Sequence, residues 1–161
     1  MDLQERRAMK TDSATGGGRE FPASSVLPRD AIEVAAGVVF RNGRVLITQR
    51  RPDDHLGGLW EFPGGKREPG ETFAACLQRE LKEELGIEVE VGEWLGSVTH
   101  AYPEKTVHLR FYRCAWRQHE PRVLGCHAFA WVTASQLSQY AFPPADETLL
   151  QKLRASAELW E

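Results

Sequence analysis

Three closely spaced glutamates, Glu80, Glu83 and Glu84, are the residues of this sequence best suited to do chemistry. On a helix, positions i, i+3 and i+4 share one face, so the three carboxylates would meet and repel one another. Oxygen ligands without histidine or cysteine suit a hard cation, and Mg2+ usually takes one or two carboxylates together with water and substrate phosphates. The spacing therefore indicates a site for Mg2+, or Mn2+ in its place. The alternative is a solvated acidic helix face, partly neutralised by Arg79 and Lys82.

A helix from Thr72 to Leu85 is the element that must position these glutamates. Apolar residues recur there at spacings of three and four, which predicts one buried stripe of Ala74, Leu77, Leu81 and Leu85. Thr72 is expected to cap the first turn, and Gly86 to end the helix in a left-handed conformation. Pro69-Gly70, just upstream, indicates a turn.

The stretch from Gly65 to Ile87 resembles the Nudix box, G-x5-E-x7-R-E-U-x-E-E-x-G-U with U aliphatic, at all nine specified positions. Its flanks resemble one branch of that family, the MutT-like nucleoside triphosphate pyrophosphohydrolases. The residues that carry this second resemblance are Gln49-Arg50-Arg51, His55, Trp60 to Lys66, Ala101-Tyr102-Pro103 and Phe142 to Asp146. The resemblance covers roughly residues 32–153, which is most of the chain.

The resemblance implies an α+β Nudix fold, in which a mixed β-sheet is sandwiched between helices (α/β/α). It also implies Mg2+-dependent hydrolysis of a nucleoside triphosphate to a monophosphate and pyrophosphate. Oxidised or modified nucleotides such as 8-oxo-dGTP or 5-substituted (d)CTP are the expected substrates. Two alternatives stay open: a Nudix hydrolase of sugar nucleotides or dinucleotide polyphosphates, and a non-catalytic module that only binds nucleotides.

Residue by residue, the resemblance assigns metal binding and catalysis to Glu80, Glu83 and Glu84, and adds the Gly64 carbonyl to the metal shell. One of the glutamates, not identified by the pattern, is expected to act as general base. Glu71 and Arg79 are expected to pair and to orient the metal ligands.

The same resemblance implies a set of substrate contacts outside the box. Arg50 and Lys66 are expected to neutralise phosphate oxygens, and His55 to contact the nucleotide. Glu61 and Phe62 are further substrate-binding candidates, although a plain core position is the stronger interpretation of Phe62. In MutT-like proteins a residue at the place of Asp146 reads the edge of the base.

Asp146 has two interpretations, a helix N-cap alone or a cap that also contacts the base. MutT-like enzymes that act on oxidised guanine nucleotides often carry Asn at this place. Ionised Asp only accepts hydrogen bonds, whereas Asn also donates them, so Asp favours a base with an amino donor such as cytosine. A second departure concerns Gly125: family members usually carry a glutamate six residues before the late tryptophan, here Trp131. Glu120 and His127 are the nearest polar residues to that position.

The remaining elements follow from local patterns. Asn42-Gly43 between two β-rich runs predicts a hairpin with a type I′ turn. Prolines predict a non-helical loop at residues 141–145. Residues 1–30 resemble a flexible tail, because they are poor in large apolar side chains, and residues 31–161 form the predicted domain. Strands are expected at residues 59–62, 87–100, 106–116 and 126–132, with a break near Gly92 or Gly96, and helices at residues 134–137 and 147–160.

Composition limits the partners of this chain. A net charge of −3 over 161 residues makes a nucleic-acid polymer an unexpected partner, because such binders are usually basic. The three cysteines are odd in number and lack metal-ligand spacing, which predicts free thiols in the cytoplasm. No apolar run is long enough for a membrane span, so a cytoplasmic monomer or homodimer is expected.

Overall fold

The computed structural model describes residues 18–19, 31–53, 57–101, 103 and 106–161. The predicted flexible tail therefore lies outside the described residues, except for strand β1 (Gly18–Arg19), which pairs with Thr99 and His100 of β6. His55 also lies outside the described residues, so its predicted contact with the nucleotide stays a prediction.

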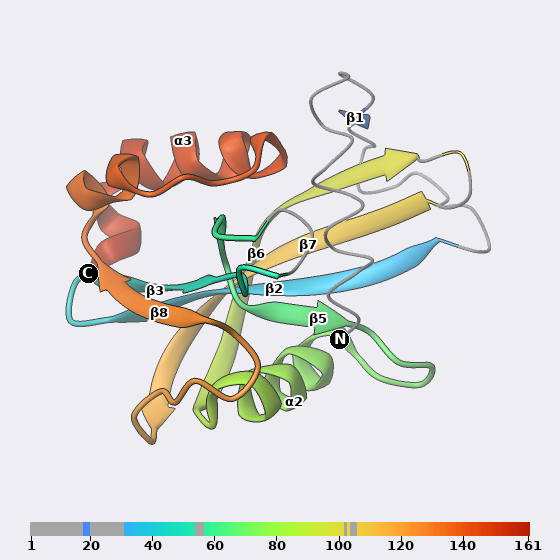
Figure 1. The fold of residues 1–161 in the computed structure, drawn as a ribbon, viewed down its shortest axis with the longest axis horizontal. Helices are drawn as coiled ribbons and strands as arrows, with labels where there is room; N and C mark the ends of the chain where they lie inside the picture. The colour runs from blue at the N-terminus through green and yellow to red at the C-terminus, as the bar shows by residue number, and fades with distance from the viewer. Residues whose placement is uncertain (1–17, 20–30, 54–56, 102, 104–105) are drawn as a thin grey trace.

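A mixed sheet forms the middle layer, and its described strands follow the order β1-β6-β7-β2-β3-β4 (Figure 1). The strands are β2 (Ile32–Arg41), β3 (Arg44–Gln49), β4 (Trp60–Glu61), β5 (Gly64–Lys66), β6 (Glu88–Ala101), β7 (Thr106–Gln118) and β8 (Ala128–Val132). β2 runs parallel to β7 on one side and antiparallel to β3 and β5 on the other. β8 pairs with the free side of β3. β2 is thus the central strand, and it reaches both the hairpin and β5.

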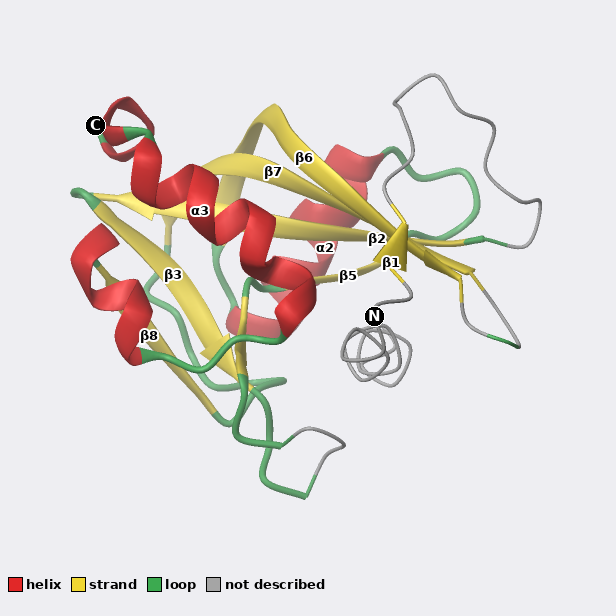
Figure 2. Ribbon diagram, turned by 90° about the horizontal axis from the view of Figure 1, so that it is seen from above, coloured by secondary structure: helices red, strands yellow, loops and turns green. Residues whose placement is uncertain are grey.

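One helix covers each face of the sheet. α2 (Phe73–Leu85) lies on one face and α3 (Glu147–Ala155) on the other (Figures 1 and 2). Side chains of β2 alternate between the two layers: Val34, Ala36 and Val38 join the α3 side, while Ala35 and Val39 join the α2 side. Because both faces are covered, the strand reads as a continuous apolar run. The predicted sandwich is confirmed, and none of its described helices has the length and apolar character that a membrane span requires.

The hairpin between β2 and β3 matches its prediction. Asn42 and Gly43 have φ angles of 51° and 74°, and positive φ at both central residues is the requirement of a type I′ turn. Arg41 pairs with Arg44 directly across this turn.

Three predicted elements differ in detail. β6 is one strand whose pairing with β7 shifts register on both sides of Trp94, so the expected break is a pair of bulges. Pro144 begins a 3-10 turn, η3 (Pro144–Asp146), and the predicted non-helical loop is wrong there because proline fits the first position of a turn. The closing helix stops at Ala155 and resumes as η4 (Ala157–Trp160), and the 134–137 helix is the 3-10 helix η2 (Ala134–Gln139).

Candidate active site

The two ends of α2 are capped as predicted. The Thr72 hydroxyl accepts a hydrogen bond from the Ala75 N–H at 3.0 Å, and Gly86 ends the helix with φ of 70°. The predicted apolar stripe needs one correction: Ala74 is exposed, because the first turn contacts the sheet through Phe73, which packs on Tyr112 at 6.0 Å. The buried face consists of Cys76, Leu77, Glu80, Leu81, Glu84 and Leu85.

Two of the three glutamates that the box places on α2 are part of that buried face. Glu80 is 1% exposed and Glu84 is 8% exposed, whereas the Glu83 side chain is 57% exposed. A buried carboxylate requires hydrogen bonds or a cation, because desolvation strongly disfavours the charged form. The solvated-face alternative therefore fails for Glu80 and Glu84 and describes Glu83 only.

Arg79 is the cation that joins this face to the preceding loop. Its guanidinium binds both Glu71 oxygens, at 2.7 and 2.9 Å, and also contacts Glu80 at 2.9 Å and Glu83 at 3.3 Å. The remaining donor reaches the Lys66 carbonyl of β5 at 3.1 Å. The predicted pairing of Glu71 with Arg79 is confirmed, and a single residue fixes helix, loop and strand to one another.

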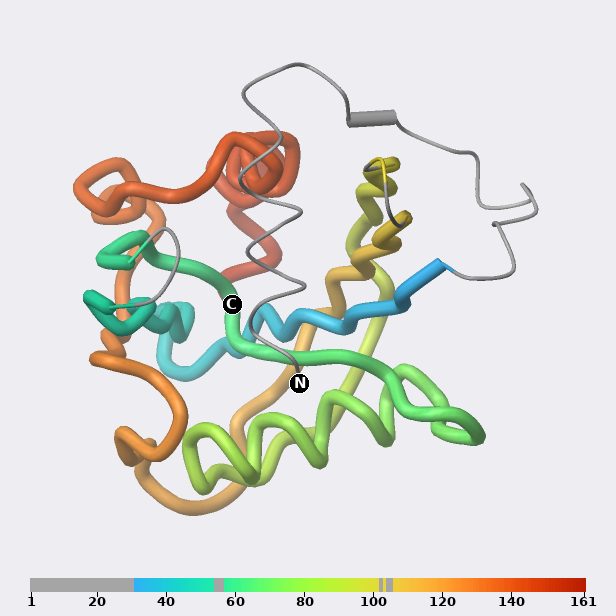
Figure 3. Tube along the Cα trace, turned by 45° about the vertical axis from the view of Figure 1, so that its right-hand side comes forward, coloured from blue at the N-terminus to red at the C-terminus, as the bar shows by residue number. Residues whose placement is uncertain are grey.

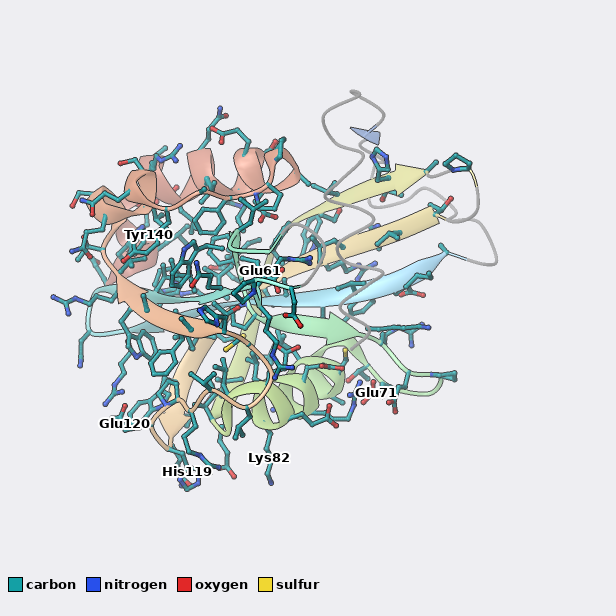
Figure 4. The ribbon with its side chains drawn as sticks, viewed as in Figure 1. Glu61, Glu71, Lys82, His119, Glu120 and Tyr140 are labelled. Carbon is teal, nitrogen blue, oxygen red and sulfur yellow. The ribbon has the colours of Figure 1, made fainter. Side chains whose placement is uncertain are left out.

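This pairing changes the acidity of Glu71. Hydrogen bonds from Arg79 are the main cause that lowers the pKa of the Glu71 carboxyl to about 2, and the Glu68 N–H adds to it. The same contacts raise the pKa of Arg79. Figure 4 shows Glu71 at the N-terminal end of α2, on the side of β5.

We expect Glu71 to stabilise the fold above pH 4.5 and to lose that contribution as the pH falls towards 2, because its pKa is lowered in the folded state. Replacing Glu71 with Gln should lower the unfolding free energy at pH 7 by about 1 to 3 kcal/mol. The difference between variant and wild type should shrink in the same acidic window. Urea unfolding at several pH values measures both effects, and a difference independent of pH would refute the assignment.

Gly64 is required by packing. A Cβ atom there would lie 1.9 Å from the carbonyl oxygen of Ala35 in β2, so only glycine permits the pairing of β5 with β2. The family resemblance had assigned a role only to the Gly64 carbonyl, in the metal shell. The glycine itself is explained by the neighbouring strand, and β5 was not predicted.

The Gly64 carbonyl nevertheless points in a useful direction. Gly37 donates to Pro63 O at 2.7 Å, so the next pair on this antiparallel ladder, Ala36–Gly64, is a non-hydrogen-bonded pair. Its carbonyl is thus directed away from β2. Lys66 lies two residues further on, so its carbonyl points to the same side, where it accepts the hydrogen bond from Arg79. The Gly64 oxygen therefore faces the side of β5 on which Arg79 of α2 lies.

Arg50 and Glu61 form a buried ion pair that the sequence analysis did not anticipate. Arg50 Nε lies 3.0 Å from Glu61 Oε1, and the two side chains are 1% and 4% exposed. Figure 4 shows Glu61 near the middle of the molecule. Both residues were predicted to bind substrate, and the structure places them together between β3 and β4. Contact with a phosphate stays a prediction for Arg50.

An aromatic group lies beside this pair, towards α3. Phe62 is fully buried and stacks on Phe142 with ring centroids 5.3 Å apart, which confirms the core interpretation. The Trp60 ring packs edge-on against the Tyr140 ring, with centroids 4.9 Å apart. The backbone N–H of Trp60 donates a hydrogen bond to the Ala141 carbonyl. Segment 140–142 is therefore attached to β4.

Asp146, four residues after Phe142, has no exposed surface, and its backbone lies in the helical region with no side-chain cap hydrogen bond. Asp146 occupies the predicted N-cap position of α3, but its side chain makes no capping hydrogen bond, because the 3-10 turn that begins at Pro144 already contains this residue. A contact with the base stays a prediction.

Gly125, the place of the missing family glutamate, lies directly against Glu84. Its N–H donates to the Glu84 carbonyl at 3.0 Å. Glu120 is bound to Arg41 by two hydrogen bonds at 2.8 and 2.9 Å, so it does not replace the missing carboxylate. His127 is exposed, and its backbone N–H donates a hydrogen bond to the Gln49 carbonyl.

Cys126 is a neighbour of the site that the sequence did not reveal, because its proximity depends on the fold. Burial, together with the charges of Glu84 and Glu61, raises the pKa of this thiol to about 11. Glu61 and Glu84 thus act on one common neighbour.

The donor set fits Mg2+. Within the described ranges, no three His, Cys, Asp or Glu side chains already converge on one point. The available oxygen ligands are two buried carboxylates on α2, Glu80 and Glu84, and the Gly64 carbonyl of β5, which points away from β2. Mg2+ usually binds one or two carboxylates and completes its octahedron with water and substrate phosphates, so this arrangement suffices.

Comparison with known proteins agrees with the geometry. Residues 35–152 match the model of the NUDIX domain. The chain is 39% identical over 130 residues to the CTP pyrophosphohydrolase of Escherichia coli, covering 77% of this chain and 92% of that protein. It is 32% identical over 124 residues to the 8-oxo-dGTP diphosphatase of E. coli, covering 76% and 96%. The solution structure of the E. coli ORF135 protein superposes with a TM-score of 0.68 at 36% identity, covering 78% and 90%.

The sequence motif, the buried acidic face of α2 and these comparisons concern the same part of the molecule. The Nudix box supplies α2 and the loop before it, and the match extends over both layers of the sandwich. The chain therefore belongs to the Nudix hydrolase family.

Proposed function

We propose that this enzyme is a Mg2+-dependent nucleoside triphosphate pyrophosphohydrolase that releases a nucleoside monophosphate and pyrophosphate. The observation that carries the proposal is the pair of buried carboxylates, Glu80 and Glu84, on one face of α2. Arg79 binds Glu80 and the Lys66 carbonyl, which holds this face beside β5. The named E. coli relatives act on CTP and on 8-oxo-dGTP, which supports a triphosphate substrate.

The residues divide the work as follows. Glu80, Glu84 and the Gly64 carbonyl would hold Mg2+, with the exposed Glu83 available for a second contact. When bound, the ion neutralises charge on the phosphates and lowers the pKa of a bound water. Arg79 holds the Glu80 carboxylate in place through its hydrogen bond at 2.9 Å. One of the three glutamates accepts the proton of the attacking water.

The base is proposed to be cytosine, or a 5-substituted cytosine, in preference to oxidised guanine. Asp146 is buried after the Phe142 segment that stacks on Phe62. An ionised carboxylate only accepts hydrogen bonds and therefore suits the exocyclic amino group of cytosine. The 39% identity to a CTP pyrophosphohydrolase supports the same choice.

We expect Asp146→Asn to shift the base preference away from cytosine. The amide adds a donor, so kcat/KM for cytosine nucleotides should fall by about 10- to 100-fold, the range of one polar contact. Turnover of 8-oxo-dGTP should fall less or rise. Equal losses on both substrates would contradict base recognition by Asp146 and leave it a packing residue.

Hydrolysis across a nucleotide panel tests the function itself, with nucleotide products measured for every member and pyrophosphate release measured for the triphosphates. The panel holds the common dNTPs and NTPs, 8-oxo-dGTP, 5-methyl- and 5-hydroxy-dCTP, ADP-ribose and a dinucleotide polyphosphate, each with and without Mg2+. Mg2+-dependent preference for a triphosphate is the expected result. Turnover of only the sugar or dinucleotide substrates would replace the substrate class. Nucleotide binding without any turnover would favour the binding module.

We also place the enzyme in the cytoplasm, as a monomer or homodimer. Cys76, Cys114 and Cys126 are free and buried, as expected in a reducing compartment. Size-exclusion chromatography with light scattering distinguishes the two oligomeric states.

A further inference from the structure

The loop between β7 and β8 binds the end of α2 that carries Glu84. Helices leave their last carbonyls without intrahelical partners. Here the Arg122 N–H donates to Leu85 O at 2.8 Å, while the Leu124 and Gly125 N–H groups both donate to Glu84 O, at 3.2 and 3.0 Å. Figure 3 shows this loop, in orange, passing the end of the helix. The loop therefore holds the backbone of Glu84 itself.

The loop also places Gly125, which has no side chain, next to the side chain of Glu84. A Cβ atom on Gly125 would lie 3.2 Å from Glu84 Cγ, 3.4 Å from its Cα and 3.5 Å from its Cβ. Gly125 is absent from the residues with positive φ, so the glycine is not explained by a left-handed backbone. It is explained by this close approach, because a side chain at position 125 would have to push the first half of the Glu84 side chain by a few tenths of an ångström.

Both ends of the loop are anchored. Arg41 lies 3.7 Å from the ring centroid of Trp116 and binds Glu120 with two hydrogen bonds, and Trp116 donates to the His119 carbonyl at 2.7 Å. At the other end the backbone N–H of His127 donates to the Gln49 carbonyl at 2.9 Å. Figure 4 shows His119 and Glu120 at the end of the molecule where α2 ends. The position of the loop relative to α2 is thus fixed at both of its ends.

We propose that Gly125 is a positioning residue for catalysis: its missing side chain lets the anchored loop pack against Glu84 and fix where that carboxylate points. Family members usually carry a glutamate at this place, and this chain uses the space for packing. The inference rests on the proposed function, because it assigns Glu84 to the chemical step. A positioning role of Gly125 would affect catalysis through the Glu84 carboxylate alone, whereas a role in stability would affect the whole fold.

The test is Gly125→Ala, compared with wild type and with Glu84→Gln on the preferred nucleotide. The methyl group must push Glu84 by a few tenths of an ångström. Because misplacement by about 1 Å reduces rates about 100-fold, kcat should fall about tenfold, with KM changed less than about twofold. In the Glu84→Gln background the same change should have less than about a twofold effect, since the affected carboxylate is already gone.

A matched control separates this effect from general strain. Gly92→Ala meets an equally close atom, the Arg113 carbonyl at 3.2 Å, on β6 and away from Glu84. It should keep kcat, with both variants melting within about 3 °C of wild type. A crystal structure of Gly125→Ala should show Glu84 displaced and Glu80 in place, a result independent of activity. Wild-type kcat in Gly125→Ala, or equal losses with and without Glu84, would overturn the inference; an inactive wild type would instead overturn the proposed function.

Discussion

Replacing Glu84 with glutamine should lower kcat at least about 100-fold, the scale of a lost acid–base or charge-stabilising group. Glutamine keeps the shape of the side chain, so the contact with Gly125 and the backbone bonds to the β7–β8 loop should persist. Only the negative charge is removed, from a position that is 8% exposed on the face proposed to hold Mg2+. Steady-state kinetics at saturating Mg2+ measures the effect.

A second measurement connects the loss to the metal. Mg2+ that binds only the folded protein should raise the melting temperature of the wild type, and Glu84→Gln should reduce that rise. Glu88→Gln is the matched control, because it removes the same charge from an exposed residue just beyond the helix. A Glu84→Gln variant with normal Mg2+-dependent turnover would refute the assignment of Glu84.

Local features of the fold were predictable because their causes are local. Asn42-Gly43 determines the hairpin turn through its own backbone preferences, and Thr72 and Gly86 determine the ends of α2. The pairing of Glu71 with Arg79 was also predictable, because the motif fixes both positions. In each case the deciding interaction spans only a few residues of the chain.

Features that depend on distant segments were not predictable. The close pairing of β5 with β2 explains Gly64, yet the two strands are far apart in the sequence. The contact of Gly125 with Glu84 likewise joins a loop to a helix that precedes it by a whole hairpin. The family resemblance had identified Gly125 only as the place of a missing glutamate. Its packing role needed the relative placement of α2 and the β7–β8 loop.

Errors near the last helix have a third cause, competition between local signals. Asp146 has the residue type of an N-cap, but the backbone starts turning at Pro144. Proline fits the first position of a turn because its fixed φ is already helical. Asp146 therefore keeps the N-cap position of α3 without a capping hydrogen bond, inside the turn and fully buried.

Breaking the buried pair of Arg50 and Glu61 should produce the largest loss of stability. Arg50→Met keeps much of the side-chain volume but leaves the Glu61 carboxylate, 4% exposed, without its guanidinium. Removing one partner of a buried ion pair typically reduces the free energy of unfolding by about 3 to 5 kcal/mol. For a domain of this size the melting temperature should fall by about 10 °C. Urea unfolding provides the free energy directly.

The neighbouring arginine supplies the control. Arg51 is exposed and donates a 3.4 Å hydrogen bond to the Leu124 carbonyl, so Arg51→Met should change stability by less than about 0.5 kcal/mol. A similar small change in Arg50→Met would contradict the structural role of the pair. Adding Glu61→Leu to Arg50→Met should recover part of the loss, because the isolated carboxylate is then removed.

The same pair complicates any test of Arg50 as a phosphate ligand. A variant that loses stability loses activity by unfolding, so the rate of Arg50→Met alone cannot separate the two roles. Arg50→Lys keeps the charge but lacks the planar donor set that reaches Glu61 through Nε. Measured well below its melting temperature, a structural role predicts lower stability with an unchanged KM for the nucleotide. A phosphate contact predicts a KM raised about tenfold at the same temperature, since one charged hydrogen bond contributes on that scale.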